Sequence, residues 1–176
     1  IKAIYPAIDF ALIGYTSASL YPHCMIDYSK DEMEIGIKKA KHKGLESGLN
    51  TLKTLRPRYY MPFAGTYIIG GSYYQKNDNL PLPEMNEAIN FFQSDKLIAK
   101  EDCKPILLNF NNYFDLKNES ISQEYQPVDQ FERNKYINKI ASTFKYTFEE
   151  LDFPSANDLE NLFRDALIRL RKKQLE

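Results

Sequence analysis

The stretch RPRYYMPFAG, residues 56–65, contains the strand around which we expect the rest of the fold to assemble. Pro57 ends the helical pattern before it, because proline disfavours helical backbone at the preceding residue. Residues 59–64 follow as a short, mostly apolar run, and Gly65 begins a turn. Parallel strands of α/β proteins often place a binding site at their carboxyl ends, so the residues that meet at this strand end are of interest.

A second strand and a long helix precede this stretch. Residues 8–15, IDFALIGY, form a nearly continuous apolar run, which is typical of a parallel strand buried on both faces. Ser29 and Glu32 form a capping box, which predicts a helix over residues 29–55. Three glycines inside that helix each weaken it by up to about 1 kcal/mol, so we expect them to allow close packing against the sheet.

The pattern continues with another helix and a third strand. Pro83 predicts the first turn of a helix whose apolar face holds Met85, Ile89 and Phe92. Residues 104–110, KPILLNF, are a further strand candidate. Strands that alternate with helices predict an α/β fold with right-handed crossovers.

The character of the chain changes after residue 110, which predicts a domain over residues 1–110 and a mostly helical extension over 111–176. A helix is expected from residue 128 to about 144, with these residues pointing inward: Val128, Phe131, Ile137, Ile140 and Phe144. Ser155 and Asp158 predict the cap of a final amphipathic helix that reaches about residue 173. Its apolar stripe is most simply core, and docking onto a partner chain is the alternative.

Composition narrows the functional classes. The 176 residues carry a net charge of −1, which argues against non-specific binding to nucleic acid or to anionic membranes. Two cysteines do not make a disulfide framework, so a reducing cytoplasm is the simplest compartment. Since the chain begins at Ile1, inside what reads as a structural element, we expect it to be a piece of a longer protein, although a genuine N-terminus stays open.

Few residues can carry chemistry. The two histidines cannot by themselves form a hydrolytic metal site, which needs three or more converging ligands. His42 lies mid-helix among lysines and is expected to be a solvated surface residue, and Cys103 is expected to be inert. His23 beside Cys24 is either a polar loop residue or part of a site.

Two loop features are the remaining candidates. Gly70-Gly71 predicts a turn that needs positive φ, since no phosphate-loop motif surrounds it. Five tyrosines fall in the predicted strand-end loops, where they either bury their rings or form a rim that stacks on sugars or bases. They are Tyr15, Tyr21, Tyr67, Tyr73 and Tyr74.

Three pieces together resemble one known family. A D-x-A-L-x-x-Y strand, a Y-P-x-C loop and an R-P-x-x-x-x-P-F-A-G strand, spread over residues 1–95, resemble the C-terminal half of metallo-β-lactamase-fold proteins. The branch is that of metal-dependent hydrolases related to CMP-N-acetylneuraminate hydroxylase and ascorbate-6-phosphate lactonases. The resemblance implies half of an αββα sandwich, whose other half carries the HxHxDH metal motif. The residues after Pro62 are Phe63, Ala64 and Gly65, where lactonase-like relatives keep a metal-binding His.

The resemblance implies a metal-dependent hydrolase in which this chain supplies half the sandwich and part of the substrate pocket, and is inactive alone. No cofactor is expected in this chain, and zinc or iron would bind only in a full-length protein. The implied partners are the N-terminal half of the same domain and a small-molecule substrate. The alternative is a non-catalytic module that recognises a nucleotide-sugar, a glycan or a partner protein. The expected pocket residues are Tyr21, His23, Cys24, Phe63, Gly65 and Tyr67.

Overall fold

A computed structural model describes residues 7–16, 19–63, 66–100, 103–149, 152 and 154–174. The chain forms two compact units, Ile1–Thr143 and Phe144–Glu176. Both helices and strands are present, so the general expectation of a mixed α and β protein is confirmed. The specific αββα arrangement and the domain division near residue 110 stay predictions.

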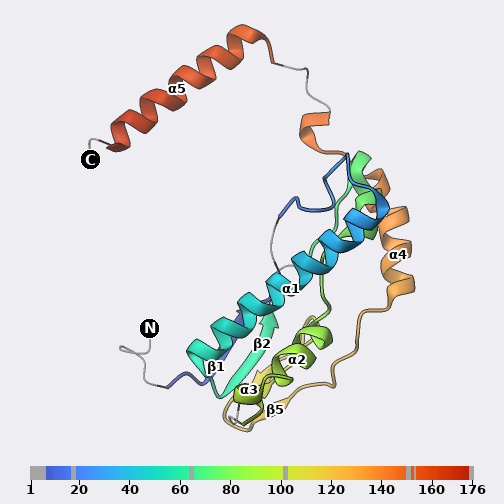
Figure 1. Ribbon diagram of the computed structural model, residues 1–176, viewed down its shortest axis with the longest axis vertical. Helices are drawn as coiled ribbons and strands as arrows, with labels where there is room; N and C mark the ends of the chain where they lie inside the picture. Colours follow the sequence, from blue (N-terminus) through green and yellow to red (C-terminus); the bar gives the residue numbers. More distant parts are fainter. Residues whose placement is uncertain are drawn as a thin grey trace. The chain divides into compact units, whose positions relative to one another are not determined.

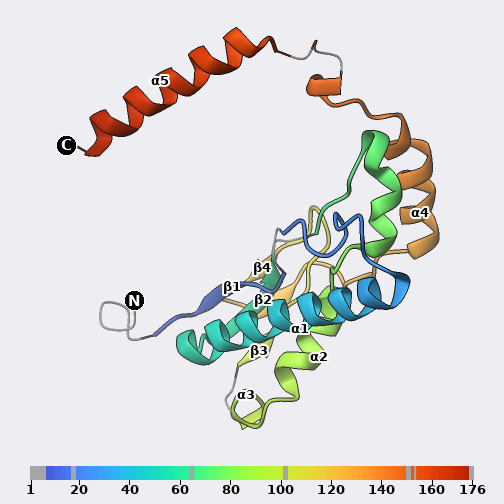
Figure 2. The same ribbon diagram turned by 45° about the horizontal axis from the view of Figure 1, so that its top comes forward.

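The secondary-structure elements follow one another along the chain in two groups (Figures 1 and 2). The first unit contains β1 (Phe10–Gly14), α1 (Lys30–Leu55), β2 (Tyr59–Phe63), the 3-10 helix η1 (Gly71–Asn79), α2 (Met85–Gln93), α3 (Lys96–Lys100), β3 (Lys104–Pro105), β4 (Phe114–Asp115), β5 (Ser120–Ile121), α4 (Gln130–Lys139) and η2 (Ala141–Thr143). The second unit contains η3 (Thr147–Glu149) and α5 (Ala156–Gln174).

The main sheet has three parallel strands in the order β1-β2-β3. Phe10 lies opposite Tyr59 and Gly14 opposite Phe63, so β1 and β2 end at the same edge. The strand predicted over 104–110 is much shorter, because only Lys104 and Pro105 pair in register with β2. The Ile106 amide still donates to the Tyr60 carbonyl at 2.8 Å, and the chain then leaves the sheet. The strands β4 and β5 form a separate antiparallel pair.

The first helix begins and ends as its sequence predicts. The Ser29 hydroxyl accepts from the Glu32 amide at 3.3 Å, and the Glu32 carboxylate accepts from the Ser29 amide at 2.9 Å, which confirms the capping box. At the other end Arg56 adopts left-handed backbone with φ 43°, and its amide donates to the Leu52 carbonyl at 2.8 Å. Pro57 then prevents the helix from continuing.

Close packing of α1 on the end of β1 explains two of its glycines. A Cβ added at Gly44 would lie 2.6 Å from the carbonyl oxygen of Tyr15. A Cβ added at Gly48 would lie 2.8 Å from the Phe92 ring and 2.9 Å from the carbonyl oxygen of Gly14. Because backbone atoms cannot yield as a flexible side chain can, these positions accept only glycine at this separation, and the expected close approach is confirmed.

The sheet has one covered face and one partly open face. Helices α1 and α2 cover the first face, where Ile13, Leu52, Tyr60 and Phe92 are fully buried in one cluster (Figure 1). On the second face Leu12 is 53% exposed, although it belongs to the same strand as Ile13. The prediction that residues 8–15 are buried on both faces is therefore wrong.

A ring of β4 covers one end of the second face. The Phe114 ring of β4 lies 4.8 Å from the Tyr59 ring and 6.0 Å from the Phe10 ring, measured between centroids. Beyond this contact, Leu12 is 53% exposed and Phe63 is 49% exposed. The open part of the face lies next to the carboxyl ends of β1 and β2.

The elements after β2 follow the sequence less closely. The Glu84 backbone caps α2, so Pro83 precedes that helix and does not form its first turn, while Met85, Ile89 and Phe92 pack on the core as expected. The 3-10 helix η1 and the short helix α3 have no counterpart among the expected elements. Of the five inward positions predicted for 128–144, only Ile137 is buried, and the other four are exposed, so that part of the prediction is wrong.

The final helix has the predicted cap but not a buried stripe. The Ser155 hydroxyl donates to the Asp158 carboxylate at 2.6 Å and accepts from the Asp158 amide at 3.2 Å. Phe163 is 74% exposed and Leu162 is 63% exposed, so the expectation that the stripe is core is not met. Over the described ranges, no helix combines the length and the apolar character that crossing a bilayer requires.

Candidate functional site

The candidate site lies where β1 and β2 end. The loop after β1 contains His23 and Cys24, and the segment after β2 contains Tyr67. Parallel strands bring their carboxyl ends to one edge of a sheet, and ligands of α/β proteins commonly bind in the loops there. The topology therefore brings together residues that lie more than forty positions apart in the sequence.

His23 is the most informative residue of this site. It is 3% exposed, and its ring lies 6.3 Å from the Tyr67 ring, measured between centroids. Among the residues that the structure describes, its Nδ1 has no hydrogen-bond partner. A buried polar nitrogen without a partner costs free energy, and such groups are often found where a ligand or a water binds.

The surroundings keep His23 neutral. Burial lowers the pKa of His23, and the nearby positive charge of Lys76 lowers it further. Burial also raises the pKa of Tyr67, with a smaller contribution from the neighbouring Cys24. At neutral pH the site therefore presents a neutral imidazole and a protonated phenol, and both can form hydrogen bonds with a polar ligand.

The 3-10 helix η1 positions the second half of the site. The Asn77 side chain is buried, accepts from the Ile69 amide at 2.9 Å and donates to the Ile69 carbonyl at 2.7 Å, which fixes the segment after Tyr67. Lys76 donates to the carbonyl oxygen of His23 at 3.2 Å and so ties η1 to the first loop. Gly71 starts η1 with φ 64°, which confirms the predicted turn of positive φ.

No sequence pattern indicates Lys76 and Asn77, because both lie in a run of polar residues that is expected to be an exposed loop. Asn77 differs from its neighbours only in being buried, and burial depends on the packing of η1. The sequence feature that could have drawn attention to Asn77 is its place in a run rich in turn-forming residues.

The structure does not place the other predicted pocket residues in the contact between His23 and Tyr67. Tyr21 packs its ring edge-on against Tyr28 at 6.1 Å, and its hydroxyl lies near Gly36 of α1. Phe63 lies at the carboxyl end of β2 on the open sheet face. Gly65 lies outside the described residues. The role of all six as pocket residues stays a prediction.

The five tyrosines do not form one rim. Tyr15 is 2% exposed, and burial, with smaller contributions from Tyr125, Glu84 and Glu87, raises its pKa to about 12. Tyr73 is half exposed on η1. A stacking surface that includes Tyr15 is therefore excluded, because its ring belongs to the core beneath α1.

The remaining candidates have structural explanations. His42 is exposed on α1, with its Nε2 3.2 Å from a carboxylate oxygen of Glu46, as expected of a surface residue. Cys103 is buried in the core cluster. Within the described part of the chain, no group of three or more His, Cys, Asp or Glu side chains could hold a metal ion. These residues therefore do not fit a zinc or iron site.

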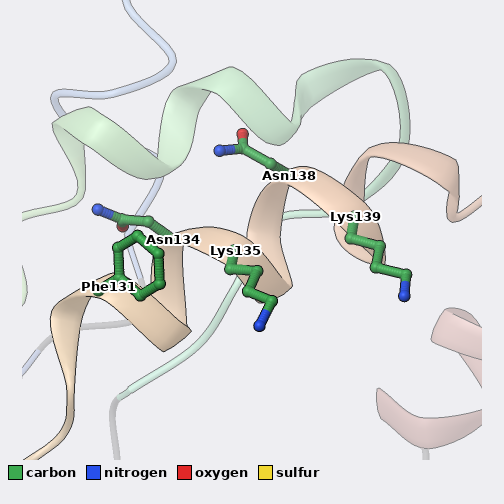
Figure 3. Close-up of a pocket in the computed structure, with 5 residues that line it drawn as sticks. All are labelled: Phe131, Asn134, Lys135, Asn138 and Lys139. Atoms are coloured by element: carbon green, nitrogen blue, oxygen red, sulfur yellow. The ribbon is translucent and has the colours of Figure 1, made fainter.

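A hollow of about 450 Å³ lies on α4 (Figure 3). All of its lining residues belong to that one helix: Phe131, Asn134, Lys135, Asn138 and Lys139. Its lining contains no carboxylate, thiol or hydroxyl group, and Phe131 is 72% exposed. The hollow is a shallow surface feature and includes none of the residues at the strand ends.

Comparison of the chain with protein-family models, with curated proteins and with solved structures found no match.

Proposed function

We propose that this chain is the C-terminal portion of a metallo-β-lactamase-fold, metal-dependent hydrolase-like protein. In this proposal it supplies half of the sandwich and part of the pocket for a small ester, lactone or phosphoester. It works in the cytoplasm together with an N-terminal half that carries the HxHxDH motif. The proposal rests on the sequence resemblance and on one structural observation.

The supporting observation is the open face of the main sheet. Each half of an αββα sandwich has helices on the outer face of its sheet and an apolar inner face that packs on the other half. Here α1 and α2 cover one face, and Leu12, Met61 and Phe63 line the open part of the other. Exposed apolar surface of this kind is unfavourable in water unless another surface covers it.

The site at the strand ends has a limited role in this proposal. The neutral His23 and the Tyr67 hydroxyl would orient a polar substrate by hydrogen bonds, and Phe63 would contact its apolar part. Since the described residues do not fit a metal site, we assign no metal-dependent step to them. Any metal would be held by the HxHxDH motif of the N-terminal half, where it would supply Lewis-acid chemistry for hydrolysis.

The test begins with the reading frame upstream of Ile1. An HxHxDH motif there is the expected result, and its absence would remove the hydrolase from consideration. The longer protein should then contain zinc or iron by elemental analysis and hydrolyse a model ester, lactone or phosphoester. The 176-residue chain, as the control, should contain no stoichiometric metal, and tight metal binding by this chain would contradict the proposal.

A second candidate function is a non-catalytic assembly module. The observation in its favour is the exposed apolar stripe of α5, which is a surface suited to another protein. The two functions differ in whether the strand-end site is needed, because an assembly module does not require a buried His23 whose Nδ1 has no hydrogen-bond partner among the described residues. Loss of partner binding after changes on α5, with no metal in the longer protein, would favour the module.

A further inference from the structure

We propose that α5 pairs with α5 of a second copy of this chain as an antiparallel two-helix coil. This inference does not depend on the proposed function, because it uses only the second unit. The capping box at Ser155 and Asp158 shows that α5 has a defined start, and the helix extends over 19 residues, about 28 Å.

The apolar stripe has the spacing of a coiled coil. Leu159, Phe163, Ala166 and Leu170 follow one another at intervals of four, three and four residues, which is the a/d pattern. Leu162 and Leu167 flank this row on its two sides. The large members are exposed, with Leu170 at 59%. An isolated helix of this length is marginally stable in water, so a second helix on this stripe would stabilise it.

The sizes of the side chains favour the antiparallel arrangement. A two-fold axis between Arg164 and Asp165 places Phe163 opposite Ala166 of the second copy, and Leu159 opposite Leu170. Every layer then has a similar volume. In a parallel pair, Phe163 would meet Phe163 and Ala166 would meet Ala166, which crowds one layer and leaves a gap in the next.

The charges favour the same arrangement. Asp158 and Glu160 lie near the start of α5, and its last turns are basic: Arg169, Arg171, Lys172 and Lys173. With roughly 100° per residue, Glu160 lies on one flank of the stripe together with Arg171, whereas Asp158 and Arg169 lie on the other.

In an antiparallel pair, each flank of the stripe on one helix lies beside the same flank on the second helix. Glu160 therefore faces Arg171 of the second copy, and Asp158 faces Arg169. The axial offset of each pair is about 3 Å. A parallel pair brings opposite flanks together and would place Glu160 beside Asp158, and Arg171 beside Arg169. Since like charges repel, charge also selects the antiparallel orientation.

The first experiment measures mass by sedimentation velocity of the full 176-residue chain over a wide range of concentration. We expect the mass to rise from 20.6 kDa to twice that value as concentration increases. Phe163→Glu places a charge in the paired stripe and should raise the dissociation constant by more than about a hundredfold. Ile168→Glu is the matched control, because Ile168 is 60% exposed and lies on the opposite side of α5, so it should leave the dimer intact.

The second experiment determines orientation. A chain with Leu159→Cys and Leu170→Cys is oxidised, and its linked peptides are identified by mass spectrometry. The antiparallel pair gives links between positions 159 and 170, which cannot form within one helix because they are about 16 Å apart. Circular dichroism shows whether each variant keeps its helix content.

Four results of the mass and cross-linking measurements would overturn the proposal. They are a chain that stays at 20.6 kDa, a dimer that persists with Phe163→Glu, links of 159 to 159 and 170 to 170, and a dimer that Leu12→Asp abolishes. The last result would place the contact on the open sheet face and would leave α5 without a role. Protection of the α5 stripe within a monomer would mean that it packs on its own chain, which also contradicts the proposal.

Discussion

The two faces of the main sheet differ far more in burial than in composition. Ile13 and Tyr60 are fully buried under α1 and α2, while Leu12 and Phe63, which lie on the same two strands, are about half exposed. Both faces are apolar, so side-chain type does not explain the contrast. Burial is decided by what packs on each face, and among the described residues the ring of Phe114 covers the second face at Tyr59.

The largest effect that the comparison predicts comes from the same substitution on the two faces. Leu52→Ala removes a fully buried side chain of α1 that packs on the covered face, and it should lower the free energy of unfolding by about 2–5 kcal/mol. Leu12→Ala, on the open face, should lower it by less than about 1 kcal/mol. Urea denaturation of both variants measures the difference, and equal losses would mean that Leu12 is buried by something in solution.

A smaller effect is expected where α1 touches the end of β1. Gly44→Ala forces a methyl group against the backbone carbonyl of Tyr15 and should cost about 1–3 kcal/mol, although alanine is the better helix former. Ser47→Ala, at an exposed position of the same helix, is the control and should change stability little or raise it slightly. A stabilised Gly44→Ala variant would show that the helix and the strand are further apart than described.

The strand-end site predicts a dependence of stability on pH. Because the pKa of His23 in the folded chain lies below its usual value of about 6.5, the unfolded chain binds the proton first as pH falls. The free energy of unfolding should therefore decrease as pH drops below about 6.5. His23→Gln should weaken this dependence. A stability that rises on acidification through this range would contradict a neutral, buried His23.

The features of the fold that the sequence predicts well are those that depend on residues close together in the chain. The capping boxes at Ser29 and Ser155 and the strand predicted over 59–64 depend on neighbouring residues. The structure confirms both caps and the strand over 59–63, and residue 64 lies outside the described residues. The close approach of α1 to β1 is predictable as well, because glycines inside a helix are unfavourable without such a reason.

The failures concern long-range packing. The apolar run at residues 8–15 predicts burial but does not say whether a second layer covers it, and Leu12 is exposed. Residues 104–110 have the composition of a strand, yet only two of them pair in register with β2. The length of the pairing depends on where the chain leaves the sheet, and composition does not show that point. The same reason applies to the site: the sequence suggests His23, Cys24 and Tyr67, whereas Asn77 is recognisable only once η1 is folded.

The most direct test of the central claim is the solvent exposure of the open sheet face in the longer protein that we propose. Hydroxyl-radical footprinting of Leu12 and Phe63 is compared between that protein and the 176-residue chain, with Ile26, 87% exposed, as the reference. We predict strong protection of Leu12 and Phe63 in the longer protein and unchanged labelling of Ile26. Equal labelling of Leu12 and Phe63 in both proteins would contradict the claim that this face packs on a second half.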